Sequence, residues 1–185
     1  MQKKVQIVSD GSLDLPQEIT DAHDIEVVPF YVSFNGETYQ KEIEEIGIRE
    51  FYQEMVDHPD VFPKSSMPSV DDFYQTFVKS AKENIPVICI CITTKFSGSL
   101  QSATVAKEMV KDEYPEARIT VIDSTVNTVL QGLYVLEACR MRDMGLDRPP
   151  RACSGRRSAH QCLAERHPSL GENARGRMGL PGGHV

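Results

Sequence analysis

A cluster of hydroxyl side chains separates the apolar run Val87–Ile92 from a segment with helical periodicity, Leu100–Val110. The hydroxyl-bearing residues of this turn are Thr93, Thr94, Ser97 and Ser99. A short run rich in β-branched residues is typical of a strand buried on both faces, as in a parallel sheet covered by helices. The start of the following helix has free N–H groups and a partial positive charge. The pattern therefore predicts an anion-binding turn between a strand and a helix.

Two other polar turns follow apolar strands. Ser9-Asp10-Gly11-Ser12 comes after Val5–Val8, and Asp123-Ser124 comes after Arg118–Ile122. Right-handed crossovers bring the ends of parallel strands to one edge of a sheet, which is where ligands of open α/β sheets lie. We therefore expect the three turns to meet at one edge.

The elements that must position these turns alternate between strands and helices, which predicts an α/β domain with a parallel sheet between two helix layers. The expected strands are Val5–Val8, Ile25–Val32, Val87–Ile92 and Arg118–Ile122. The expected helices are Pro16–Ala22, Gly47–Val56, Val70–Glu83, Gln101–Lys111 and Val129–Met144. Asn35-Gly36 between apolar residues predicts a β-hairpin.

Several local details can be predicted as well. Asp14 before Leu15-Pro16 is expected to cap the first helix, and Ser69 to cap the helix that follows it. The prolines of Pro63–Ser69 argue against regular structure in that segment. In the expected helix Gly47–Val56, the side chains that we expect to face the core are Phe51, Tyr52 and Met55.

The charge of the chain is uneven. The formal net charge is −7, yet the last segment, 148–185, contains seven Arg, two Glu and no Lys. We expect a folded domain over residues 1–147. The change in residue usage after it fits a disordered basic tail or, as the favoured interpretation, a shifted reading frame; either way we assign the segment no function.

The composition also bears on partners and compartment. An acidic body argues against nucleic acid or an anionic membrane as the main partner. No apolar run is long enough to cross a bilayer. Five cysteines without a secretion signal indicate a reducing cytoplasm, and no Cys-x-x-Cys pair or glycine-rich nucleotide motif is present. We expect no metal and no cofactor other than a bound ligand.

Four segments together resemble the DegV family of bacterial fatty-acid-binding proteins, some of which are lipid-binding subunits of a fatty acid kinase. They are Ser9–Pro16, Pro63–Ser69, Thr93–Ala103 and Val121–Ser124. The resemblance covers residues 3–147. It implies a long-chain fatty acid held between two α/β domains and presented to a partner such as the kinase.

The resemblance also implies which residues bind. The fatty acid carboxylate would be held by Ser65 and Ser97, with Ser66, Thr94 and Gly98 beside them. Two departures stand out. Met67 occupies a position where the family usually has Gln, and nothing after Asp147 resembles the second family domain, which is therefore expected to be missing.

Simpler roles remain open for the same residues. Ser97 could have the purely structural role of capping the helix after it. Ser65 and Ser66 could likewise serve simply as turn-forming residues. Asp10 and Asp14 fit a turn former and a cap better than a metal pair. Two alternative functions also remain: a serine hydrolase using Ser97, and a stand-alone interaction module. The hydrolase lacks a Gly-x-Ser-x-Gly elbow and a placed His base, so we expect no enzyme activity.

Overall fold

A computed structural model describes residues 5–145 of the chain. The boundary expected at residue 147, and the tail 148–185 with it, lie outside the described residues. The main sheet has four parallel strands in the order β2 (Ile25–Val28), β1 (Gln6–Asp10), β6 (Val87–Cys91) and β7 (Ile119–Asp123). Every residue of β1 and β6 is buried, as expected for central strands covered on both faces.

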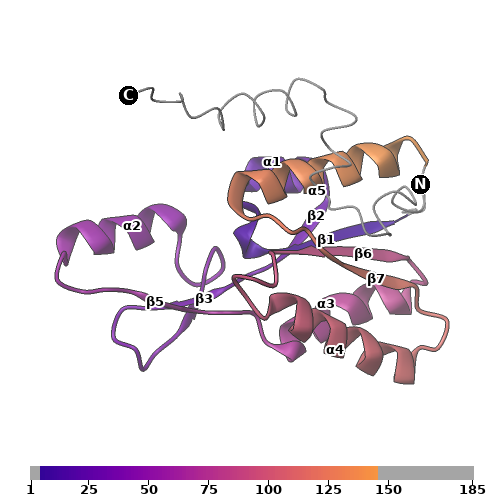
Figure 1. The fold of residues 1–185 in the computed structure, drawn as a ribbon, viewed down its shortest axis with the longest axis horizontal. Coiled ribbons are helices and arrows are strands. Elements are labelled where there is room, and N and C mark those ends of the chain that lie inside the picture. Colours follow the sequence, from indigo (N-terminus) through magenta and orange to yellow (C-terminus); the bar gives the residue numbers. More distant parts are fainter. Residues whose placement is uncertain (1–4, 146–185) are drawn as a thin grey trace, which may run out of the picture.

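Helices cover both faces of this sheet (Figure 1). One face carries α1 (Gln17–Ala22) and α5 (Thr128–Asp143), and the other carries α3 (Val70–Lys82) and α4 (Ser99–Glu113). Strand side chains alternate between the two faces. Ile7 accordingly packs in one core with Tyr134 and Val135. Val8 packs in the other, with Phe73 and Phe77. The three-layer α/β fold expected from the sequence is confirmed.

A small antiparallel sheet lies beside the main one, in the order β4 (Gln40–Lys41), β3 (Tyr31–Ser33) and β5 (Lys64–Ser66). The predicted Asn-Gly hairpin joins β3 to β4. Gly36 has a φ of 75°, and the Asn35 side-chain oxygen accepts from the amides of Glu37 (2.9 Å) and Thr38 (2.8 Å). The small sheet and α2 (Ile48–Asp57) extend away from the main sheet as a separate lobe (Figure 1).

The prediction of one strand over Ile25–Val32 is wrong. β2 ends at Val28, and after Pro29 and Phe30 the chain enters the other sheet as β3. Proline cannot donate a ladder hydrogen bond, so it ends pairing in the main sheet. The prediction of no regular structure in Pro63–Ser69 is wrong too. β5 fits between the two prolines as an edge strand, where flanking prolines are tolerated.

Two local expectations also fail. Asp14 does not cap α1: with a φ of 52° it closes the short 3-10 helix η1 (Gly11–Leu13), a left-handed position that Asp tolerates. In α2, Tyr52 is 61% exposed and Met55 is exposed as well. Phe51 is half-buried against Phe34. The apolar face of α2 does not face the main core, because α2 lies in the outer lobe.

The cap of α3 is confirmed and joins the two sheets. The Ser69 hydroxyl accepts from the Asp72 amide (3.1 Å), and Asp72 accepts from the Ser69 amide (2.8 Å). The same carboxylate receives the Tyr31 hydroxyl at 2.9 Å and lies 3.0 Å from the Lys41 ammonium. Asp72 therefore fixes β3 and β4 against the start of α3.

These contacts set the pKa of Asp72. Burial alone would raise it, but hydrogen bonds from the Ser69 hydroxyl and amide, and from Lys41 and Tyr31, outweigh burial and hold the pKa below its ordinary value. A lowered carboxyl pKa contributes stability above the unfolded pKa, near 3.9, and this contribution is lost as the pH falls through the folded value.

Ser69→Ala is expected to lower the free energy of unfolding by about 1 kcal/mol at neutral pH, because it removes the cap and one donor to Asp72. The loss should shrink as the pH falls below the unfolded pKa, about 4, and through the lower folded pKa of Asp72, where the carboxylate takes up a proton. Urea unfolding as a function of pH measures it. Ser80→Ala, a buried serine of the same helix without a side-chain hydrogen bond to any described residue, is the control. An equal, pH-independent loss in both variants would contradict this account.

Candidate functional site

The three polar turns meet at one edge of the main sheet, as expected. The Thr94 hydroxyl, after β6, donates to Asp123 at the end of β7 (2.9 Å). The Ser99 hydroxyl donates to Asp10 at the end of β1 (2.7 Å). Segments far apart in the sequence are thus joined directly by side chains.

Asp10 is fully buried, and four donor groups lie within hydrogen-bond distance of its carboxylate. One carboxylate oxygen accepts from the Ile92 amide (2.9 Å) and the Ser99 hydroxyl. The other accepts from the Gln131 side-chain amide (2.8 Å) and lies 2.8 Å from the Ser12 hydroxyl. No lysine or arginine of the described chain forms an ion pair with it.

The start of α4 presents hydrogen-bond donors at the surface. The Ser97 oxygen accepts from the Ser99 amide (3.2 Å), which leaves the Ser97 hydroxyl hydrogen available. The amides of Gly98 and Leu100 donate to no other described residue. Gly98, the N-cap, has no side chain that could satisfy them. One hydroxyl and two amides at the positive end of a fifteen-residue helix form a site suited to a carboxylate.

Thr94 plays a different part in the structure. Its hydroxyl donates to Asp123, and its amide lies 3.4 Å from the same carboxylate oxygen. A hydroxyl has a single hydrogen to donate. Thr94 therefore holds the turn to the end of β7, and the expectation that it also contacts the ligand remains a prediction.

Ser65 and Ser66 lie on β5, where neighbouring side chains point to opposite faces. Ser65 pairs with Val32 and Ser66 pairs with Tyr31. Both serines are exposed, and neither side chain is hydrogen-bonded to another described residue. At most one of them can face a ligand bound on one side of the small sheet.

Met67 lies where the two segments that carry the predicted site residues, Pro63–Ser69 and the turn before α4, come together. A Cβ built on Gly98 would lie 2.8 Å from the Met67 sulfur. The Pro63–Ser69 segment therefore reaches the turn before α4, with a thioether at the point of contact. Met67 is 45% exposed and adds apolar surface beside the donors of the turn, as does Phe96, which is 74% exposed.

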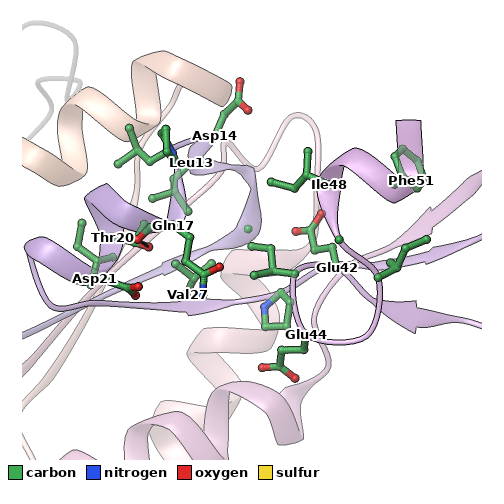
Figure 2. A pocket seen from close by; sticks show the side chains of 18 of the residues that line it. Leu13, Asp14, Gln17, Thr20, Asp21, Val27, Glu42, Glu44, Ile48 and Phe51 are labelled. Atoms are coloured by element: carbon green, nitrogen blue, oxygen red, sulfur yellow. Dashed lines mark hydrogen bonds between the residues drawn. The ribbon is translucent and has the colours of Figure 1, made fainter. Parts of the chain in front are cut away.

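A groove of about 870 Å³ opens elsewhere, between the η1–α1–β2 region and residues 42–52 (Figure 2). None of the five predicted site residues lines it. Its border is acidic, and the contributing carboxylates are Asp14, Glu18, Asp21, Glu26, Glu42 and Glu44. Glu42 accepts from the Phe30 amide (3.0 Å), and burial raises its pKa. The groove would repel a fatty acid carboxylate, so the turn before α4 is the better candidate.

Gln131 is the main participant that sequence reasoning missed. It is fully buried on α5, on the side that carries Tyr134 and Val135. A polar residue within an apolar helix face was the available signal. The next residue, Gly132, permits close approach of α5, because a Cβ there would collide with the Leu13 carbonyl oxygen.

The described residues offer little support for other chemistry. They contain no group of three or more His, Cys, Asp and Glu side chains that could hold a metal ion. In the same part of the chain, Ser97 has no histidine partner: His23 follows α1, and His58 lies beside Glu54 after α2. No helix within the described residues is long and apolar enough to cross a membrane.

The fold and the turn define a three-layer α/β protein in which a helix start with unused hydrogen-bond donors lies at the edge of a parallel sheet. The chain belongs to the DegV family: the family model described as "Uncharacterised protein, DegV family" matches residues 4–149. A DegV domain-containing protein of Clostridium acetobutylicum is 37% identical over 143 residues, which are 77% of this chain and 49% of that protein. Protein DegV of Bacillus subtilis is 31% identical over 147 residues, 78% of this chain and 50% of that protein.

Solved structures agree with this assignment. A stearic acid-binding protein from Eubacterium ventriosum is 46% identical, with a TM-score of 0.75, over 77% of this chain and 48% of that one. A DegV family protein from Thermus thermophilus, described by its fatty acid binding, is 29% identical with a TM-score of 0.65, over 93% of this chain and 54% of that one. The chain spans about half the length of the relatives it matches.

Gly98→Ala and Met67→Ala are expected to be non-additive in unfolding free energy. The φ of Gly98 is −81°, so alanine introduces no backbone strain there, and its cost arises from the Met67 sulfur. Truncating Met67 should relieve that cost and give a coupling of about 0.5 kcal/mol in a double-mutant cycle, a small value because the exposed Met67 side chain can turn aside. Met109→Ala is the control in place of Met67→Ala, because Met109 is an exposed methionine of α4, the helix that begins after Gly98. Full additivity in both pairs would contradict a coupling between Gly98 and Met67.

Proposed function

We propose that this chain binds a long-chain fatty acid and that the turn before α4 holds the carboxylate. The observation that supports this most is the set of free donors at Ser97, Gly98 and Leu100. One solved relative with the same fold is described as a stearic acid-binding protein, and another is described by its fatty acid binding.

The chemistry of the turn matches such a ligand. A carboxylate has two acceptor oxygens, and hydrogen bonds between charged and neutral groups contribute more than neutral ones. We assign the donors to the Ser97 hydroxyl and the Gly98 and Leu100 amides. Ser65 is the further hydroxyl contributed by β5, with Ser66 as its opposite-face neighbour and Thr94 as the residue that holds the turn.

The acyl chain would supply most of the binding free energy. Each buried methylene contributes about 0.8 kcal/mol, so a chain of sixteen carbons outweighs the head-group contacts, which mainly fix orientation. Met67 and Phe96 offer apolar surface beside the donors. This chain spans about half the length of its relatives. We propose that, in the relatives, the other half of the protein forms the remaining wall around the acyl chain.

We further propose that the bound acid is presented to a partner enzyme rather than converted by this chain. A serine without a neighbouring base is a poor nucleophile, and Ser97 has no histidine near it among the described residues. A fatty acid kinase, implied by the family resemblance, is the candidate partner. Labelling of Ser97 by a serine-directed phosphonate would favour the hydrolase instead.

Ser97→Ala is expected to weaken fatty acid binding by about 1.5–3 kcal/mol, because a hydrogen bond to a charged group is lost. Ser65→Ala should weaken it as well, and Ser66→Ala, on the opposite face of β5, should have the smaller effect. Displacement of a fluorescent fatty acid measures the affinities, and native mass spectrometry of the purified chain identifies any bound acid. Unchanged binding in both Ser97→Ala and Ser65→Ala would refute the site.

A further inference from the structure

We propose that Asp10 and Gln131 are positioning residues for this site. Through Ser99 they hold the start of α4 in the conformation that leaves the Ser97, Gly98 and Leu100 donors free for a carboxylate. The inference rests on the proposed function, because it explains how the same turn becomes able to bind.

Asp10 cannot contact the ligand itself, since it is fully buried. A buried carboxylate is costly unless donors satisfy it, so its surroundings must keep their hydrogen bonds. The four donors come from four different parts of the chain: the end of β6, the start of α4, α5 and η1. Asp10 therefore fixes α4 relative to three other elements at once.

Ser99 transmits this restraint to the ligand side of the turn. Its hydroxyl donates inward to Asp10 (2.7 Å), while its amide donates outward to the Ser97 oxygen (3.2 Å). The Ser97 oxygen is occupied by that amide, so its hydroxyl hydrogen is directed to other acceptors. A shift of Ser99 would move the Ser97 hydroxyl and the neighbouring Gly98 amide together.

Gln131 keeps the Asp10 carboxylate in place. Its side-chain nitrogen donates to Asp10 (2.8 Å) and to the Ser9 hydroxyl (3.1 Å), and its oxygen lies 2.7 Å from the Ser12 hydroxyl. Ser9 in turn donates to the Ile90 carbonyl oxygen (2.8 Å). The amide therefore links α5 to both central strands below the turn.

The test compares two alanine substitutions in α4. Ser99→Ala removes the bond to Asp10. Ser102→Ala removes a buried hydroxyl of the same helix that is not hydrogen-bonded to any other described residue. The probes are decanoate and decanol, which share an alkyl chain, and only decanoate carries a carboxylate. We expect Ser99→Ala to weaken decanoate binding about tenfold, the equivalent of one hydrogen bond, and to leave decanol binding unchanged. Ser102→Ala should alter neither affinity.

A role in general stability would lower both affinities of Ser99→Ala in parallel, which would overturn the inference. So would an unchanged preference for decanoate. If the parent chain itself binds decanoate no more tightly than decanol, the proposed function fails instead.

A measurement without ligand separates these failures. Amide hydrogen exchange at residue 99, divided by the intrinsic rate of the residue present, should be faster in Ser99→Ala than in the parent, because the amide no longer stays aligned on Ser97. Exchange in Ser102→Ala should match the parent. Equal exchange at residue 99 in all three proteins would show that Asp10 does not order the turn, whatever the outcome with decanoate.

Discussion

The structure depends on one buried carboxylate that has no cationic partner among the described residues. Asp10 ends β1 and satisfies its charge with donors from Ile92, Ser99 and Gln131, together with the nearby Ser12 hydroxyl. Losing any of these donors would leave a charged group partly unsatisfied in the interior, which is expensive. This constraint fixes the relative positions of four segments around Asp10: the ends of β1 and β6 and the starts of α4 and η1. The surface turn with free donors is a consequence of that internal order.

A second carboxylate, Asp72, connects the small lobe to the same body. It differs from Asp10 in having a cation, Lys41, and in lying at the start of a helix, where the macrodipole also favours it. Because Asp72 holds β3 and β4 against α3, it sets where β5 and Met67 lie relative to Gly98. The two halves of the candidate site are therefore placed by two separate carboxylates.

Most of the main sheet could be predicted from sequence, because its strands are short apolar runs followed by polar turns. The meeting of these turns followed from the handedness of crossovers, and the Ser69 cap from local chemistry. The end of β2 before Pro29 had a signal in the sequence, the proline itself, but the pairing of Tyr31–Ser33 in a second sheet could not be predicted, because only tertiary contacts decide which strands pair. The role of Gln131 was not predicted for a related reason: its hydrogen-bond partner Asp10 lies far away in the sequence. The placement of Ser65 and Ser66 on opposite faces required the strand assignment of β5.

The central claim is that a carboxylate binds at the start of α4. Titrating the isotope-labelled chain with decanoate, and separately with its methyl ester, while following backbone amide resonances tests it most directly. The account predicts the largest shifts at the Gly98 and Leu100 amides with decanoate, and small shifts at these amides with the ester, which lacks the charge. Shifts confined to the acidic groove lined by Asp14 and Glu44, or equal shifts with both ligands at the turn, would contradict it.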